Sequence, residues 1–225
     1  LIINKEMVPK MLKLIEKEFA KIDGKLNSKK RSKVQRKLYK KLPDNNNELI
    51  ELFDELVTEG DWHVFWLVTI WIKRKQTLYQ KEFMSYYENW LFNHINSWGS
   101  CDVFCYRVLN PMLEKYPDLY ENILSWANSD QTYVRRAAPV SLLESTRSFK
   151  VNYSFSKVIK VVNKLNKDKE LHVQKAVGWL LKYTYLSYPD QTYDYLKKNV
   201  DDLARVIFRY ALEKAPEKEK TELMK

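Results

Sequence analysis

The segment "VQKAVGWLLK", residues 173–182, indicates the fold class of this chain, because related segments recur on either side of it. "VRRAAPVSLL" (134–143) precedes it and "LARVIFRYAL" (203–212) follows it. Each begins with an apolar residue, continues with polar or small positions that include a base, and ends in an apolar run. The segments begin 39 and 30 residues apart. That spacing is typical of helical-hairpin repeats, which stack into a curved solenoid.

Helical periodicity extends over most of the remaining sequence. Apolar residues recur with a period close to 3.6 in residues 5–22 and in a series of later segments. The expected later helices are 46–59, 62–76, 80–95, 100–114, 118–128, 131–146, 154–166, 170–186, 190–199, 201–214 and 217–224. Only four glycines occur, too few for the tight turns of a sheet protein. We therefore expect an all-α fold, a right-handed α-solenoid of antiparallel helix pairs. It would form a single domain over 1–225, with atypical N-terminal helices in 1–45 and the repeats in 46–216.

The chain is strongly basic, with a formal net charge of +10 and a pI near 9.3. Such a charge favours a polyanionic partner, most often nucleic acid. The alternative is a charge that serves solubility or reflects a generally basic proteome. Bases recur on the second helix of successive pairs: Lys73, Arg74, Arg107, Arg135, Arg136, Lys175, Lys182, Arg205 and Arg209. In a solenoid these helices would line a concave basic groove that binds a duplex backbone by phosphate contacts, without reading base sequence. For each base alone, a solvated helix face is the alternative.

The cysteines and apolar runs indicate where the protein works. Cys101 and Cys105 are the only two cysteines, which favours a reducing, cytoplasmic location over a disulfide framework. The longest apolar runs, such as 64–72, are too short to span a membrane, so no membrane partner is expected. The two thiols with His94 and His172 lack the spacing of a zinc finger or ribbon. We expect buried thiols, no metal, no cofactor and a monomer.

Three motifs resemble the DNA alkylation repair glycosylases built from HEAT-like repeats: "WGSCD" (98–102), "WANSDQTYVRRAA" (126–138) and "HVQKAVGWLLKY" (172–183). The resemblance extends over about 46–216. It implies an α-solenoid that cups double-stranded DNA, on the nucleoid of a bacterial-type cell, and hydrolyses the N-glycosidic bond of N3- or N7-alkylated purines. It further implies the following roles: Asp102 as the catalytic carboxylate, Trp98 and Trp179 against the lesion, and Arg136 on the DNA backbone. Arg135, Lys175 and Lys182 are expected to add phosphate contacts.

The residues themselves fit this chemistry. An N3- or N7-alkylpurine is cationic, so the base departs as a neutral molecule and needs no general acid. One carboxylate then suffices to stabilise the developing oxocarbenium sugar and orient a water molecule. The faces of Trp98 and Trp179 would attract the cationic base. A purely structural alternative exists for each residue. Asp102 would lie at a helix start capped by Ser100 and be stabilised by the helix dipole, while Trp98 would close a turn and Trp179 would belong to the core.

Three features depart from the family pattern or from simple helix rules. Residues 21–42 are dense in Lys and Arg and lack the Phe- and Gly-rich turn that many members carry there. Either the segment is shortened, or Tyr39 and the basic cluster replace its contacts; a solvated connecting helix is the structural alternative. Lys182 stands where the family has Arg, which loses the bidentate fork. Gly178 inside a helix suggests either close helix approach or a backbone near the groove.

Two functions other than a glycosylase remain open. The first is a non-catalytic HEAT-repeat protein that binds DNA by charge and shape. The second is a HEAT scaffold that binds other proteins. Binding to DNA that weakens with salt, without release of a base, would distinguish the first from an enzyme. Partner binding that does not weaken with salt would indicate the second.

Overall fold

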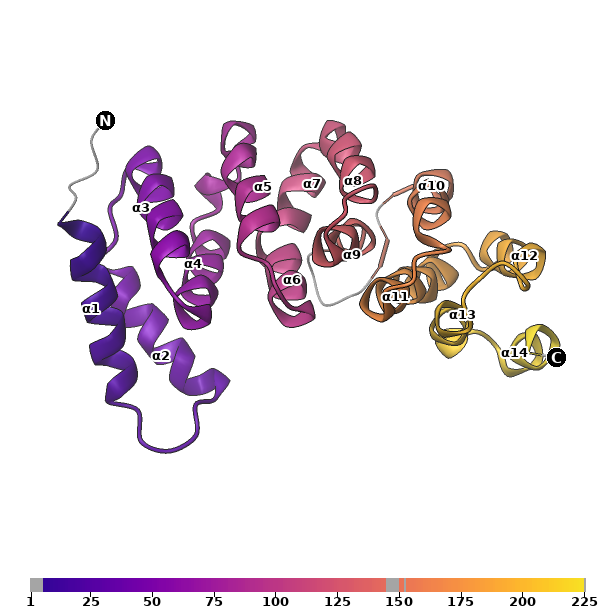
Figure 1. The fold of residues 1–225 in the computed structure, drawn as a ribbon, viewed down its shortest axis with the longest axis horizontal. Coiled ribbons are helices and arrows are strands. Elements are labelled where there is room, and N and C mark those ends of the chain that lie inside the picture. Colours follow the sequence, from indigo (N-terminus) through magenta and orange to yellow (C-terminus); the bar gives the residue numbers. More distant parts are fainter. Residues whose placement is uncertain (1–5, 145–149, 152, 225) are drawn as a thin grey trace. The chain divides into compact units, whose positions relative to one another are not determined.

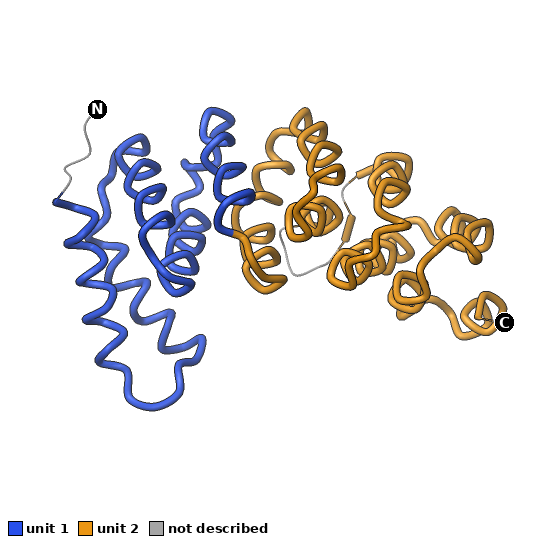
Figure 2. Tube along the Cα trace, viewed as in Figure 1, with its two compact units in different colours: residues 1–94 blue, residues 95–225 orange. Residues whose placement is uncertain are grey.

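The computed structural model describes residues 6–144, 150, 151 and 153–224 (Figure 1). These residues form helices joined by turns, and the only β pairing among them is an isolated bridge between Leu143 and Val151. The expected all-α class is therefore confirmed for the described part of the chain. No helix within it is both long and apolar enough to cross a membrane. The chain divides into two compact units, Leu1–His94 and Ile95–Lys225 (Figure 2).

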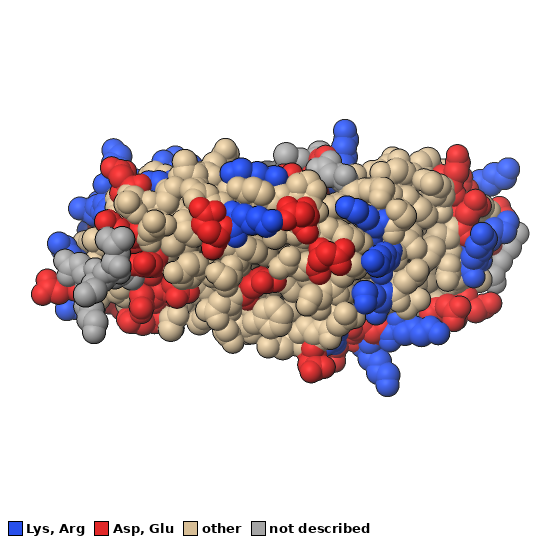
Figure 3. Space-filling view, turned by 90° about the horizontal axis from the view of Figure 1, so that it is seen from above, with Lys and Arg blue, Asp and Glu red and all other residues tan. Residues whose placement is uncertain are grey.

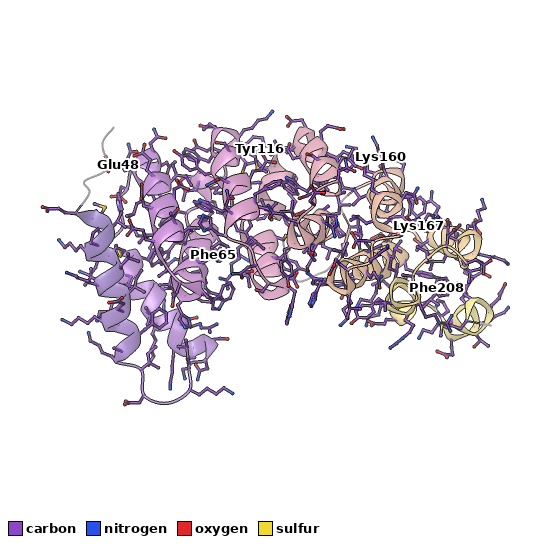
Figure 4. The ribbon with its side chains drawn as sticks, viewed as in Figure 1. Glu48, Phe65, Tyr116, Lys160, Lys167 and Phe208 are labelled. Atoms are coloured by element: carbon purple, nitrogen blue, oxygen red, sulfur yellow. The ribbon has the colours of Figure 1, made fainter. Side chains whose placement is uncertain are left out.

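The first unit contains five α-helices and two 3₁₀ turns among its described residues. These are α1 (Met7–Ala20), α2 (Ser28–Tyr39), α3 (Asn46–Glu59), α4 (Trp62–Arg74), η1 (Gln76–Leu78), η2 (Lys81–Phe83) and α5 (Met84–Asn93). Helix α1 packs against α2 and α3, and α3 packs against α4 and α5. The starts of α3 and α4 follow from their N-caps, because the Asn45 and Asp61 side chains accept hydrogen bonds from the first turns. Phe65 of α4, labelled in Figure 4, is buried in this core.

The second unit contains the three recurring segments. Its elements are α6 (Trp98–Phe104), the π-helical turn η3 (Cys105–Leu109), α7 (Asn110–Lys115), η4 (Pro117–Leu119), α8 (Tyr120–Trp126), α9 (Thr132–Val140), α10 (Phe155–Leu165), α11 (Leu171–Ser187), α12 (Pro189–Lys198), α13 (Arg205–Ala211), η5 (Leu212–Lys214) and α14 (Glu217–Leu223). The recurring segments fall on α9, α11 and α13, and α11 packs against both of the others. Helix α8 packs against α9, and α10 packs against both α9 and α11.

Helix α9 is shorter than the 131–146 expected from its periodicity. It ends at Val140, and Pro139 in its last turn has no N–H to donate. The buried Asn110 side chain then donates hydrogen bonds to the carbonyl oxygens of Val140 at 3.2 Å and Leu143 at 2.7 Å. These bonds satisfy carbonyls that a continuing helix would have used. Residues 145 and 146 of the expected helix lie outside the described residues.

Gly178 of α11 faces α13 at a close contact between the two helices. A Cβ atom at this position would lie 2.5 Å from Tyr210 Cβ and 2.8 Å from the Ile207 carbonyl oxygen. Both partners belong to α13, and the close oxygen is backbone, so the clash cannot be relieved by turning a side chain. The close helix approach that the sequence suggested is therefore present.

Replacing Gly178 by alanine is expected to destabilise the protein by about 1–3 kcal/mol through overpacking, more than the gain of about 1 kcal/mol in helix propensity. Thermal unfolding followed by circular dichroism measures the effect. Gly99→Ala is the matched control, because a Cβ at Gly99 of α6 meets no atom within 4 Å. A Gly178→Ala protein that melts higher than the parent, as the Gly99→Ala protein should, would contradict the close packing.

Candidate functional site

A cavity of about 540 Å³ in the second unit gathers most of the residues singled out in the sequence. Helices α6, α9, α11 and α13 supply its walls. It is lined by Trp98, Asp102, Arg136, His172, Lys175, Trp179, Lys182 and Tyr210. Six of the seven predicted residues are therefore neighbours in space. The seventh, Arg135, does not line the cavity.

The helix that carries Asp102 begins earlier than the sequence suggested. Ser97, not Ser100, is the N-cap: its hydroxyl accepts a hydrogen bond from the Ser100 backbone N–H, and the Ser100 side chain accepts one from the Ser97 N–H. The prediction of Ser100 as the cap was wrong, because this capping box begins α6 at Trp98. Asp102 consequently lies beyond the first turn and caps nothing. One helical turn separates it from Trp98, so both side chains lie on one face.

Asp102 forms a two-pronged ion pair with Arg136 of α9. Arg136 Nε donates to Asp102 Oδ1 at 3.0 Å, and Nη2 donates to Oδ2 at 2.9 Å. Nη1 donates to the backbone carbonyl oxygen of His172 on α11. The Arg136 and Asp102 side chains are only 6% and 17% exposed. These bonds connect α6, α9 and α11 through Arg136, and the bidentate pair holds the Asp102 carboxylate in one orientation.

Two opposing effects act on the acidity of Asp102. Burial raises the pKa of Asp102 above the ordinary value of an aspartate, because a charged carboxylate loses solvation. The hydrogen bonds and positive charge of Arg136, together with nearby His172, act to lower that pKa. Arg136 is therefore the main group that opposes the effect of burial on the pKa of Asp102.

Neither tryptophan has the purely structural position considered for it from the sequence. Trp98 is 56% exposed, although large apolar side chains are usually buried, so it does not close a turn by packing. Trp179 is half-buried, and its ring centroid lies 6.0 Å from that of Tyr106. Both indoles line the cavity. A flat cationic ligand entering it would meet aromatic faces and the Asp102 carboxylate together.

The four bases expected to bind phosphate are in different situations. Arg136 holds Asp102, and it retains one unused N–H on each terminal nitrogen. Arg135 Nε donates to Asp168 Oδ2 at 2.6 Å, which braces α9 against the turn after α10. Lys182 pairs with Glu213 of η5 at 2.7 Å. Lys175 lines the cavity and makes no hydrogen bond or salt bridge within the described part of the chain.

Two cavity residues were missed as site residues in the sequence. His172 directly precedes the recurring segment on α11, but only a metal role was considered for it. Tyr210 lies in the recurring segment on α13 and reaches the cavity because Gly178 lets the two helices approach. Tyr210 is the eighth residue of its recurring segment, and Trp179 is the seventh residue of the segment on α11. This near-equivalence was the one available signal.

The two cysteines lie in the hydrophobic core between the helices. Cys101 and Cys105 are both fully buried and unbridged, and the Cys101 thiol donates to the Tyr133 carbonyl oxygen. Burial raises the pKa of the Cys101 thiol well above its ordinary value, which disfavours a reactive thiolate. Within the described residues, no three His, Cys, Asp or Glu side chains are arranged to hold a metal ion.

Comparison with known proteins identifies relatives of this fold. The model of the DNA alkylation repair enzyme family matches residues 24–215. A predicted DNA alkylation repair enzyme from Enterococcus faecalis has a similar structure, with a TM-score of 0.71 at 15% identity over 95% of this chain and 97% of that one. AlkD2 from Streptococcus mutans gives 0.66 at 18% identity over 92% and 98%. No curated protein matches the sequence significantly. At these identities the two structures show a shared fold alone.

Proposed function

This chain belongs to the DNA alkylation repair enzyme family, and we propose that it serves DNA repair by hydrolysing the N-glycosidic bond of cationic N3- or N7-alkylpurines in duplex DNA. One observation carries the proposal: Asp102 is a half-buried carboxylate held by a guanidinium, in the same cavity as two indole rings. The enzyme would be monofunctional, releasing the free base and leaving an abasic sugar.

The carboxylate has the properties that this reaction needs. As the glycosidic bond lengthens, positive charge moves from the purine to the sugar, so a fixed anion beside the sugar gains strength in the transition state. Arg136 uses one lone pair on each oxygen of Asp102, which leaves others free for a water molecule. Asp102 would therefore orient water toward the sugar while its own position stays fixed by Arg136.

The indoles would hold the leaving base. Trp98 stands four residues before Asp102 on α6, and Trp179 faces the cavity from α11. A cationic base gains about 0.5–2 kcal/mol from each aromatic face, depending on how far both are desolvated. That attraction disappears once the base is neutral, which favours its release. Unmodified purines lack the charge, so the same contacts discriminate against them.

Phosphate contacts are proposed to complete the site. Lys175 is the best-placed candidate for a phosphate contact, because it lines the cavity and no carboxylate is paired with it in the described chain. Lys182 would have to exchange Glu213 for phosphate, and Arg136 would use its remaining N–H groups. We further propose that the helix pairs of the second unit stack as HEAT-like repeats whose α9, α11 and α13 face a concave basic groove.

The proposal is tested by incubating the purified protein with duplex DNA that carries 7-methylguanine or 3-methyladenine and measuring the free base by chromatography. Release of free base is the expected result. DNA binding that weakens with salt, without release of a base, would indicate a non-catalytic DNA-binding protein instead of an enzyme. Absence of both release and salt-sensitive binding would leave a protein-binding scaffold.

Replacing Trp98 by alanine is expected to weaken binding of cationic lesions specifically. Because Trp98 is 56% exposed, its removal should change the free energy of unfolding by no more than about 0.5 kcal/mol. Affinity for duplex carrying 7-methylguanine should fall about 2- to 30-fold, which corresponds to one cation–π contact. Fluorescence anisotropy with methylated and unmodified duplexes separates the two effects. An equal loss on both duplexes would remove Trp98 from lesion recognition.

A further inference from the structure

The positive charge of this chain is concentrated in one short stretch. Residues 23–41 contain nine Lys or Arg against the single acid Asp23, a net charge of +8 out of +10 for the whole chain. The remaining sequence is therefore nearly balanced. On the face shown in Figure 3, basic and acidic side chains are intermixed with broad neutral areas. Helix α2 of the first unit, not the cavity of the second, carries the excess.

Three of these bases on α2, together with Lys40 at its C-cap, form one face. Lys29, Lys33, Arg36 and Lys40, here called the basic face, follow one another at spacings of four, three and four residues, and all are exposed. At about 100° per residue they fall within an arc of about 60°. The buried Val34 and Leu38 lie on the opposite side and pack against the protein.

Three of the other bases around α2, Lys30, Arg31 and Lys37, have partners within the first unit. Lys37 pairs with Glu18 of α1 at 2.8 Å. Lys30 donates to the backbone carbonyl oxygens of Asp23 and Lys25, and so fastens the turn before α2. Arg31 lies over the Trp66 ring, 5.6 Å from its centroid. Among the described residues, the side chains of the basic face form no hydrogen bond and no salt bridge.

The fold holds this row of like charges in place. Lysines and arginines three or four residues apart repel one another and disfavour a helix. Here Asn27 caps α2 by accepting from the Lys30 N–H at 3.0 Å. The buried side of α2 is tied down at Gln35, which accepts from Trp71 Nε1 at 3.1 Å and from Arg74 Nη1 at 3.0 Å. A rigid helix thus presents four uncompensated cations to solvent.

We propose that the basic face of α2 is a docking surface for the phosphate backbone of duplex DNA, separate from the cavity that contains Asp102. Lys29 and Lys40 stand about 16 Å apart along the helix axis. Duplex DNA carries one charge per roughly 1.7 Å of its axis, so four phosphates are within reach of the four side chains. Such contacts supply affinity and positioning without reading sequence or lesion.

Two observations favour duplex DNA over other anionic partners. A membrane-binding helix inserts apolar side chains, but Val34 and Leu38 of α2 are buried in the protein, and none of its large apolar residues is exposed. A surface for single strands stacks bases on free aromatic rings. The nearest ring on α2, Tyr39, is covered by the Arg74 guanidinium, 4.0 Å from the ring centroid.

The test compares two variants that each lose four positive charges. One changes the basic face: Lys29→Gln, Lys33→Gln, Arg36→Gln and Lys40→Gln. The control changes four exposed lysines scattered over the second unit: Lys160→Gln, Lys169→Gln, Lys198→Gln and Lys214→Gln. Affinity for an unmodified duplex is measured by fluorescence anisotropy from about 50 to 200 mM salt.

The basic-face variant should bind at least about tenfold more weakly at the lower salt, and the slope of log affinity against log salt should become shallower by about 3 to 4, since each phosphate contact contributes about 0.9. The control should retain nearly the parent slope. Equal changes of affinity and slope in both variants would mean that only the net charge of the protein matters, which would overturn the proposal. Because the helix loses self-repulsion, the basic-face variant should melt no lower than the parent.

The choice of duplex and one further measurement complete the test. Unmodified duplex is used throughout, so a failure of base hydrolysis at Asp102 does not affect the result. Binding to vesicles containing phosphatidylserine is measured in parallel. Strong vesicle binding that depends on the basic face, with duplex affinity independent of it, would overturn the proposal in favour of a membrane surface.

Discussion

Replacing Asp102 by asparagine is expected to slow the release of 7-methylguanine from duplex DNA by about 10²–10³-fold, the usual effect of removing one group that stabilises transition-state charge. The amide is nearly isosteric, and its oxygen can still accept from Arg136 Nε. What disappears is the negative charge that would stabilise the sugar cation. Affinity for the duplex should persist or increase, because the variant is one charge more positive.

Single-turnover base release, measured with enzyme in excess over DNA, checks this prediction. Asp201→Asn is the matched control: Asp201 is exposed, lies outside the cavity, and loses the same charge. Far-ultraviolet circular dichroism and a thermal melt establish that the Asp102→Asn protein is folded at the assay temperature. Parent-like release by a folded Asp102→Asn protein would remove Asp102 from the reaction.

Much of the fold could be predicted from local signals. The expected helix 46–59 coincides with α3, because Asn45 is a strong N-cap and the apolar period is regular. Helix α2 was not delimited within 21–42, because its charged residues obscure the period and only Val34 and Leu38 carry it. The π-helical turn η3 after α6 has no local sequence signature.

The site could be predicted in part. Trp98, Asp102 and Trp179 were grouped through a family resemblance, and the structure brings them to one cavity. The Asp102–Arg136 pair was missed, since the two residues are 34 positions apart and each also has a purely local interpretation. The pairing of Lys182 with Glu213 likewise depends on how η5 folds back on α11. Side-chain partners across helices follow from packing, which periodicity alone does not specify.

Removal of Arg136 is expected to have the largest effect on stability. Arg136→Met leaves the half-buried Asp102 carboxylate without its counter-charge, and breaking a buried pair of this kind costs up to about 3–5 kcal/mol. The Asp102→Leu/Arg136→Met double variant should recover most of that loss, because an apolar pair replaces the unpaired charge. Urea unfolding at neutral pH compares the parent and the two variants. A double variant no more stable than Arg136→Met would show that this ion pair is not what stabilises the α6–α9 contact.

The Arg136→Met variant should also respond to pH in a defined direction. Burial already raises the pKa of Asp102, and the bonds and charge of Arg136 oppose that rise. Without Arg136 the pKa of Asp102 in the folded protein rises further above its unfolded value. The folded state then binds the proton more tightly, so the contribution of Asp102 to the stability of the variant is greatest at acid pH and is lost as the pH increases through the folded pKa. Base release needs ionised Asp102, so the acid limb of its pH profile should move to higher pH in Arg136→Met. An unmoved acid limb would mean that the group titrating in the reaction is not Asp102.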